Sequence, residues 1–262
     1  MQKVQLPSGL HVTRCGQGQD LVLLHGWGVN SGVWAPIIAP LQARFRLHLI
    51  DLPGFGDNVN ILPADYQLDS LAAMLEDAVP DNAWLMGWSM GGLIANQLAL
   101  RGKVKLARLL LLATSPKFTA QPPWHGIQPA ILEMFAAQLT ADVGKTLHRF
   151  LAIQAMGSES ARQDVKIISA AVQSRPVPTK QTLQKGLDLL ETCDLRNAVS
   201  ALCLPVELIF GRLDTLVPHK AMDDIAACYP GARLKLFPHA SHAPFISHSE
   251  EFCDWLLECQ AQ

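Results

Sequence analysis

Ser89 lies at the centre of a Gly-Trp-Ser-Met-Gly pentapeptide, and this motif constrains the chain more than any other feature of its sequence. The motif directly follows the apolar run 83–86 and precedes the helix-forming stretch 92–100. A G-x-S-x-G pentapeptide between a strand and a helix is the setting in which a serine becomes a nucleophile. We therefore predict a sharp strand-to-helix turn that presents the Ser89 hydroxyl at the edge of a sheet.

Two glycines flank this serine, each two residues away. Gly87 and Gly91 have no Cβ, so a tight turn can bring the strand and the helix together without a clash. The turn also aims the first free N–H groups of the helix at the serine, where they favour negative charge. An acyl-transfer nucleophile needs both properties.

Apolar runs that end in turn signals recur along the first half of the chain and return near its end. They lack polar alternation, as is typical of parallel strands covered on both faces. The runs cover residues 21–24, 47–51, 83–86, 109–113, 205–210 and 232–237. The carboxyl ends of such strands are where the functional loops of an open α/β sheet collect.

This rhythm breaks between residues 117 and 188, where helical segments alternate with proline-rich stretches and no convincing strand is found. We predict one α/β core made of residues 1–116 and 189–262, with a mostly parallel central sheet and helices on both faces. Residues 117–188 are predicted to form a helical lid inserted into that core. A single unit of this size buries about three quarters of its unfolded surface.

A serine nucleophile needs a base, and the base needs an orienting acid. Asp214 and His242 each follow a predicted strand, at the same sheet edge as Ser89. The chain order Ser, Asp, His is the order found in α/β-hydrolases. We therefore predict a triad with Ser89 as nucleophile, His242 as base and Asp214 as orienting acid, on an α/β-hydrolase fold.

Two residues compete for places in this triad. His239 lies three residues before His242, but it follows the last strand too closely, and His242 lies in the loop proper. Asp51 also ends a strand, but it precedes the nucleophile and is followed by a Pro-Gly turn, so we interpret it as a turn residue.

Acyl transfer also requires N–H donors for the oxyanion of the tetrahedral intermediate. The backbone N–H of Met90, the residue after the nucleophile, is the first candidate. The second should come from the loop after an early strand, and the backbone N–H of Trp27 is placed there. A serine nucleophile indicates cleavage of an ester, a thioester or a carbon–carbon bond.

Bulk composition excludes several classes of partner. The net charge of −2 gives no general attraction to nucleic acid or to an acidic membrane surface. No apolar stretch reaches 18 residues without a charge, and residues 1–10 lack the apolar region of a signal peptide. The six cysteines form no C-x-x-C pair and are expected to be reduced thiols. We therefore expect a cytoplasmic monomer without a metal site, a membrane contact or a nucleic-acid partner.

Five segments carry a wider resemblance: 25–28 (His-Gly-Trp-Gly), 51–56 (Asp-Leu-Pro-Gly-Phe-Gly), 87–92 (Gly-Trp-Ser-Met-Gly-Gly), 210–214 (Phe-Gly-Arg-Leu-Asp) and 239–244 (His-Ala-Ser-His-Ala-Pro). With the lid segment 149–154, they resemble the pimeloyl-acyl-carrier-protein methyl ester esterases of bacterial biotin synthesis over essentially the whole chain. The resemblance implies hydrolysis of the methyl ester of a pimeloyl chain carried on acyl carrier protein, which frees the distal carboxylate, and it implies no cofactor. It also implies a set of substrate-binding residues: Trp27, Trp88, Ser89, Met90, Phe150, Leu151, Ala152, Ile153, Gln154 and His242.

The predicted lid is basic within an acidic chain. Residues 117–188 hold eight Lys and Arg against five Asp and Glu, a net charge of +3, so the remaining residues carry −5. Lys145 and Arg149 are four residues apart, as are Arg162 and Lys166, so each pair would share one helix face. Four such cations would attract an acidic carrier protein. The resemblance favours this docking role over an ordinary solvated surface.

Two other functions stay open at this point. A general short-chain carboxylesterase or a carbon–carbon bond hydrolase would use the same triad, and would be distinguished by its preference for free esters or dienones. A ligand receptor on the same fold would be acylated once and would not turn over.

Overall fold

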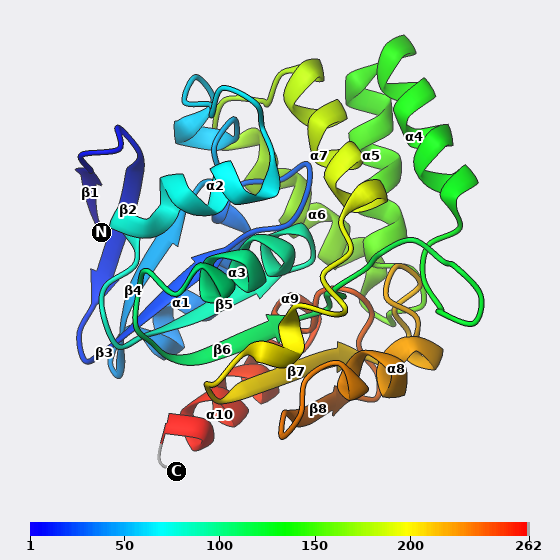
Figure 1. The fold of residues 1–262 in the computed structure, drawn as a ribbon. Helices are drawn as coiled ribbons and strands as arrows, with labels where there is room; N and C mark the ends of the chain where they lie inside the picture. The colour runs from blue at the N-terminus through cyan, green and yellow to red at the C-terminus, as the bar shows by residue number, and fades with distance from the viewer. Residues whose placement is uncertain (261–262) are drawn as a thin grey trace.

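The computed structural model describes residues 1–260, and its centre is an eight-stranded sheet (Figure 1). The strands are β1 (Gln2–Gln5), β2 (His11–Gly16), β3 (Gln19–Leu24), β4 (Phe45–Ile50), β5 (Ala83–Trp88), β6 (Leu106–Leu112), β7 (Val206–Gly211) and β8 (Arg233–Phe237). Their order is β1-β2-β4-β3-β5-β6-β7-β8, and only the pairs β1–β2 and β2–β4 are antiparallel. The predicted mostly parallel α/β sheet is therefore confirmed.

The two strands that the sequence did not predict, β1 and β2, form a hairpin at one edge of this sheet. Their exposed faces carry polar side chains, so they lack the continuous apolar run that marked the central strands. The predicted strands fall within β3 to β8, with small differences at their ends.

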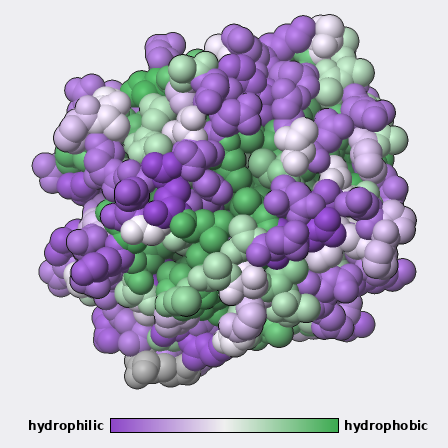
Figure 2. All heavy atoms as spheres, in the orientation of Figure 1, coloured by the Kyte–Doolittle hydropathy of each residue, from purple (hydrophilic) through white to green (hydrophobic). Residues whose placement is uncertain are grey.

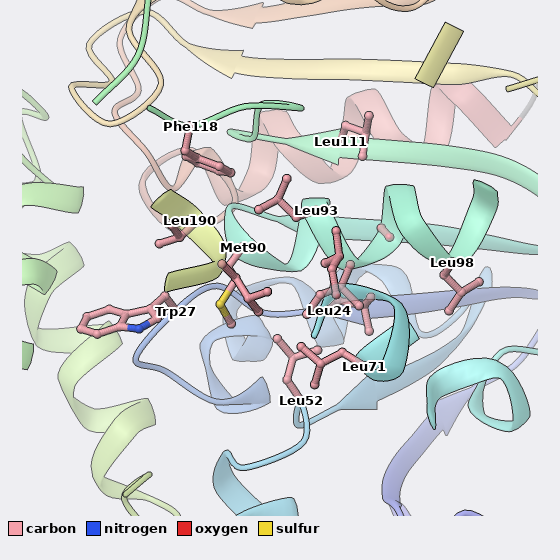
Figure 3. Packing of buried hydrophobic residues seen from close by; sticks show 14 of the residues in the cluster. Leu24, Trp27, Leu52, Leu71, Met90, Leu93, Leu98, Leu111, Phe118 and Leu190 are labelled. Carbon is pink, nitrogen blue, oxygen red and sulfur yellow. The ribbon is translucent and has the colours of Figure 1, made fainter. Parts of the chain in front are cut away.

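Side chains that alternate along each central strand enter two separate hydrophobic clusters, one on each face of the sheet. In β3, Val22 and Leu24 join the cluster beneath α2 and α3, while Leu21 and Leu23 join the cluster beneath α1 and α10. This is why the central strands are apolar without alternation. Figure 3 shows the first cluster at close range, and Figure 2 shows apolar residues at the centre of the same face, over α3 and β6.

Helices cover both faces of the sheet and also form a separate layer above its carboxyl edge (Figure 1). They are α1 (Ala35–Leu41), α2 (Leu68–Leu75), α3 (Met90–Arg101), α4 (Pro129–Ala141), α5 (Val143–Gln154), α6 (Ala161–Gln173), α7 (Lys180–Thr192), α8 (Met222–Ala227), α9 (Pro244–Ser247) and α10 (Ser249–Gln260). No helix within residues 1–260 is both long and apolar enough to cross a membrane.

The helices α4 to α7 follow one another between β6 and β7, in the region predicted to be the lid. We call residues 117–192 the lid, because α7 continues to Thr192 and the predicted boundary at residue 188 lies inside that helix. Local capping fixes two of these helices. The Asp142 side chain accepts the Lys145 N–H at the start of α5, and Thr179 accepts the Thr182 N–H at the start of α7.

Candidate active site

Ser89 lies in the sharp turn between β5 and α3, with a backbone φ of 55° and ψ of −121°. A non-glycine residue in this region costs about 1–3 kcal/mol, so the surrounding structure must hold it there. The close approach that this turn creates explains the flanking glycines. A Cβ on Gly87 would lie 2.4 Å from the Gly91 carbonyl oxygen, and a Cβ on Gly91 would lie 2.4 Å from the Leu24 carbonyl oxygen.

Hydrogen bonds on both sides of Ser89 hold this strained turn. Its N–H donates to the Leu112 carbonyl oxygen at 3.0 Å, and its own carbonyl oxygen accepts the Thr114 hydroxyl at 2.7 Å. Thr114 was not singled out from the sequence, although its position directly after the apolar run 109–113 places it at the functional edge of the sheet. Its side chain fixes the backbone that carries the nucleophile.

Asp214 and His242 form a buried pair beyond the ends of β7 and β8. His242 Nδ1 lies 2.7 Å from Asp214 Oδ2, and both side chains are about 1% exposed. The other carboxylate oxygen, Oδ1, accepts the N–H groups of Leu216 at 2.8 Å and Val217 at 3.0 Å. Because a carboxylate only accepts, His242 donates through Nδ1–H, and its Nε2 is left with a free lone pair.

The backbone of His242 is held from two directions. Its carbonyl oxygen accepts the indole N–H of Trp88 at 2.8 Å, and its N–H donates to the Gln154 carbonyl oxygen, at the end of lid helix α5, at 3.1 Å. The Nε2 atom is buried without a hydrogen-bond partner among residues 1–260, the Ser89 hydroxyl included. Catalytic hydrogen bonds are commonly long in a free enzyme and shorten when substrate is bound.

The two competing residues lie in other surroundings. His239 is exposed, and the histidine that bonds to Asp214 is His242. Asp51 is buried, and its carboxylate accepts the backbone N–H groups of Ser31 and Asp57. Asp51 therefore organises the turn after β4, as its sequence context suggested.

The backbone N–H groups of Trp27 and Met90 have no hydrogen-bond acceptor within residues 1–260. Met90 opens helix α3, where the first N–H groups have no intrahelical partner. Trp27 lies in the loop after β3, and this loop passes the nucleophile closely. A Cβ on Gly26 would lie 3.2 Å from the Ser89 Cβ. The geometry supports both N–H groups as donors to an oxyanion.

The Trp27 side chain joins this loop to the lid. Its indole N–H donates to the Leu183 carbonyl oxygen of α7 at 2.8 Å, and its ring meets Phe150 of α5 edge to face at 4.6 Å. A Cβ on Gly186 of α7 would lie only 2.6 Å from the Trp27 ring and 3.3 Å from the Met90 sulfur. Figure 3 shows the Met90 side chain reaching from α3 toward Trp27.

The structure divides the other expected substrate-binding residues into three groups. Trp27, Met90 and Phe150 belong to one hydrophobic cluster, whereas the side chains of Trp88 and Leu151 belong to the cluster on the opposite face. Trp88 packs against Trp34 and Phe245 and bonds to His242, so it supports the base. In α5, Ala152 is exposed, Ile153 is partly buried, and Gln154 is buried with its side-chain oxygen unpartnered within residues 1–260.

The four cations expected to bind a carrier all lie on the surface of α5 and α6, which pack against each other. Lys145, 89% exposed, makes a long ion pair of 3.5 Å with Asp142. Arg149, Arg162 and Lys166 are exposed and have no ion-pair partner among the described residues. Their side chains are therefore available to a binding partner.

His25, which the sequence did not mark as functional, is fully buried at the start of the Trp27 loop. Its Nε2 accepts the Leu52 N–H at 2.9 Å, and its Nδ1 lies 2.8 Å from the Gly26 carbonyl oxygen. Burial lowers the pKa of His25 to about 4, so the ring stays neutral and braces the loop by hydrogen bonds alone. Among residues 1–260, no group of three or more His, Cys, Asp and Glu side chains could hold a metal ion. The six cysteines are free thiols.

The chain is similar to known proteins in sequence and in fold. Residues 21–249 match the family model described as alpha/beta hydrolase fold. The chain is 47% identical over 244 residues to a pimeloyl-acyl-carrier-protein methyl ester esterase of Pseudoalteromonas atlantica, covering 93% of this chain and 95% of that protein. It is 45% identical to the protein of the same name from Vibrio vulnificus, covering 96% of this chain and 98% of the relative.

A solved structure supports the fold independently. An esterase from Exiguobacterium antarcticum superposes with a TM-score of 0.86, over 99% of both chains, at 22% sequence identity. At this level of identity the likeness concerns the fold alone. With the family model and the full-length relatives, it follows that the chain belongs to the α/β-hydrolases and, within them, to the family of pimeloyl-acyl-carrier-protein methyl ester esterases.

Proposed function

We propose that this chain is a serine carboxylesterase that hydrolyses the methyl ester of pimeloyl-acyl carrier protein and frees the distal carboxylate for biotin synthesis. The observation that carries the proposal is a buried Asp214–His242 pair whose Nε2 has no partner among residues 1–260, in a chain related over nearly its whole length to esterases of that name. The chemistry needs no group beyond the side chains and backbone of this site.

In the first half-reaction, Ser89 Oγ attacks the carbonyl carbon of the methyl ester while His242 Nε2 accepts the hydroxyl proton. Asp214 stabilises the resulting imidazolium through Nδ1–H. The carbonyl oxygen becomes an oxyanion, which the N–H groups of Trp27 and Met90 stabilise. The tetrahedral intermediate then breaks its bond to the methoxy oxygen, and His242 returns the proton to that oxygen, so methanol leaves.

In the second half-reaction, water attacks the acyl group on Ser89 and gives its proton to His242. The same two N–H groups stabilise the second oxyanion. When this intermediate collapses, the bond to Ser89 Oγ breaks and His242 returns the proton to the serine. The product is the free carboxylic acid, still attached to its carrier at the other end.

The lid supplies the surface on which the carrier would dock. Arg149 and Arg162 lie on neighbouring helices and are free of ion pairs among the described residues. An open cavity of about 380 Å³ lies between these helices, and Leu147 and Val172 are among its lining residues. Leu147 also approaches the Trp27 loop, since its Cδ2 atom lies 2.8 Å from the Cβ position of Gly28. Cations beside an apolar path suit an acidic carrier with an acylated arm.

The catalytic proposal is tested with Ser89→Ala. Purified acyl carrier protein bearing the pimeloyl methyl ester is the substrate, and the free acid is measured by mass spectrometry. We expect kcat to fall by about five to six orders of magnitude, as in other triads that lose the nucleophile. A variant that keeps activity near that of the wild type would refute the triad. The wild type should also prefer the carrier-bound ester, and a higher kcat/KM for free esters or dienones would contradict the proposed substrate.

The docking proposal is tested with Arg149→Glu combined with Arg162→Glu. We expect KM for the carrier-bound ester to be higher in this double variant than in the wild type. Because the attraction is electrostatic, added salt should also raise KM of the wild type. Hydrolysis of a p-nitrophenyl ester should be almost unchanged. Lys103→Glu with Lys105→Glu is the matched control, since both lysines are exposed and lie between α3 and β6, at the opposite sheet edge. Equal losses on both substrates, or in both double variants, would contradict docking on the lid.

A cellular experiment tests the biological part of the proposal. A biotin-requiring strain that lacks its own esterase should grow without biotin when it carries this chain, and should not grow with the Ser89→Ala form. Growth with both forms would contradict the proposed role. That the chain acts as a monomer in the cytoplasm stays a prediction of the sequence.

A further inference from the structure

Arg175, in the segment between α6 and α7, reaches from the lid into the core. Its terminal nitrogen Nη1 lies 2.5 Å from Asp51 Oδ2 and 2.6 Å from the Ser31 hydroxyl, and 3.5 Å from Asp57 Oδ2. The side chain of Arg175 is 19% exposed and that of Asp51 is 1% exposed. One guanidinium nitrogen of the lid therefore joins three groups that all belong to the core.

Asp51 is itself the centre of a buried network. Its Oδ1 accepts the Ser31 N–H at 2.6 Å, and its Oδ2 accepts the Asp57 N–H at 2.7 Å. Burial by itself would raise the pKa of this carboxyl, but His25, Arg175 and the two N–H groups together outweigh burial and hold the pKa below its ordinary value. The group is therefore a carboxylate at neutral pH, and because the His25 ring is neutral there, its charged side-chain partner is Arg175 of the lid.

The loop that carries the Trp27 N–H is fastened at both ends to the same turn. At its start, His25 accepts the Leu52 N–H, and at its end the Ser31 N–H donates to Asp51. Besides the Trp27 contacts with Leu183 and Phe150, the lid contacts the loop at Asn30, whose side-chain amide donates to the Val172 carbonyl oxygen at 3.2 Å. The loop is thus held between the turn after β4 and the end of α6.

We propose that Arg175 is a positioning residue for catalysis: by joining the lid to Asp51 and Ser31, it holds the Trp27 loop in the conformation that presents its N–H to the oxyanion. The proposal rests on the mechanism above, in which that N–H is one of two donors. It assigns the lid a part in the chemical step, beyond covering the substrate. The interaction is unlike a surface ion pair, because breaking it would leave Asp51 buried without its counter-ion.

The test is Arg175→Met, with Arg175→Gln as a second variant if the first folds poorly. The substrate is a short p-nitrophenyl ester, which needs no carrier protein, and kcat is expressed per serine titrated with a phosphonate. Loss of one oxyanion donor lowers kcat by about a hundred- to a thousandfold. Displacing a donor without removing it should therefore lower kcat by about tenfold or more. We expect KM to change less than about threefold, because the donor acts on the transition state.

Two further measurements separate positioning from a structural role. A trifluoromethyl ketone forms a hemiketal with Ser89 whose oxyanion uses the same two donors, so its affinity should fall by a factor similar to that for kcat/KM. Arg175→Lys should restore part of kcat, because a single nitrogen makes all three contacts. Lys180→Met is the matched control, since this exposed lid cation has no ion-pair partner among the described residues, and it should match the wild type.

The proposal is overturned if kcat per titrated serine in both Arg175→Met and Arg175→Gln stays within about twofold of the wild type. It is also overturned if kcat falls while the affinity for the ketone is unchanged. These outcomes are distinct from failure of the proposed substrate, in which the wild type would hydrolyse the small ester but not the carrier-bound one.

Discussion

Gly211, the last residue of β7, offers a sharp test of how the base is positioned. A Cβ at this position would lie 1.9 Å from the Ser241 carbonyl oxygen and 2.6 Å from the Ala240 carbonyl oxygen. Both atoms belong to the backbone immediately before His242, so no side-chain rotation can relieve the contact. The Gly211→Ala variant therefore forces the loop that carries the base away from β7.

The size of the displacement follows from the structure. Real Cβ atoms essentially never lie within 3.0 Å of another heavy atom, so the Ser241 oxygen must retreat from 1.9 Å by about 1.1 Å. A misplacement of about 1 Å in catalytic geometry lowers the rate by about a hundredfold, and we expect that loss in kcat. Overpacking of this kind should also destabilise the fold by about 1–3 kcal/mol, which corresponds to a decrease in Tm of several degrees.

The assay is hydrolysis of a p-nitrophenyl ester at a temperature well below the Tm of each variant. Gly102→Ala is the control, because it should lose about 1 kcal/mol through its left-handed φ of 62° but meets no atom within 4 Å. Gly102 ends α3 at the far side from Ser89, so its variant should keep the activity of the wild type. A folded Gly211→Ala enzyme with kcat within about threefold of the wild type would refute the reasoning.

Three further predictions follow from single contacts of the site. Thr114→Val removes the hydroxyl that bonds to the Ser89 carbonyl oxygen, so we expect the free energy of unfolding to fall by about 1–3 kcal/mol in urea titrations, together with a lower kcat; unchanged values of both would contradict the role of that bond. Asp214→Asn should lower kcat by about 10⁴-fold in steady-state assays, because an amide facing Nδ1 favours the wrong tautomer of His242, and a loss below tenfold would count against the assignment. His25 has a pKa of about 4 in the folded chain and 6.5 as its ordinary value, so the unfolded chain binds a proton first as the pH falls. The free energy of unfolding should therefore decrease by up to about 3 kcal/mol between pH 6.5 and pH 4, and His25→Gln should show a shallower decrease in urea titrations at several pH values.

The parallel core could be predicted because its physical requirements are local. The inner part of each central strand is covered on both faces, so it is a continuous apolar run, as in residues 21–24 of β3 and 109–112 of β6. The hairpin β1–β2 was missed because an edge hairpin with one solvated face needs no such run. The predicted lid boundary at residue 188 falls within α7, because nothing in the sequence near that residue stops a helix that ends at Thr192.

Several supporting contacts had no signal in the sequence. Arg175 is one cation among several in a basic segment, and only the folded chain brings it to Asp51, 124 residues away. Trp88 is among the substrate-binding residues that the resemblance implies; alternate residues of a strand point to opposite faces, and only the fold shows its side chain in the cluster opposite that of Met90, bonded to the His242 carbonyl oxygen. A residue's distance along the chain from Ser89 does not determine the face on which it acts.

The sequence by itself determined the kinds of chemical group at this site and the strand ends on which they lie, because a glycine-flanked turn and an apolar run depend only on neighbouring residues. The tertiary structure alone decided which supporting atoms meet around them: the Trp88 indole on the His242 carbonyl, and the lid cation on Asp51. The physical reason is the separation along the chain over which each kind of interaction acts. Steric and hydrogen-bonding preferences act over a few residues of chain, whereas contacts across more than a hundred residues exist only after the core has packed.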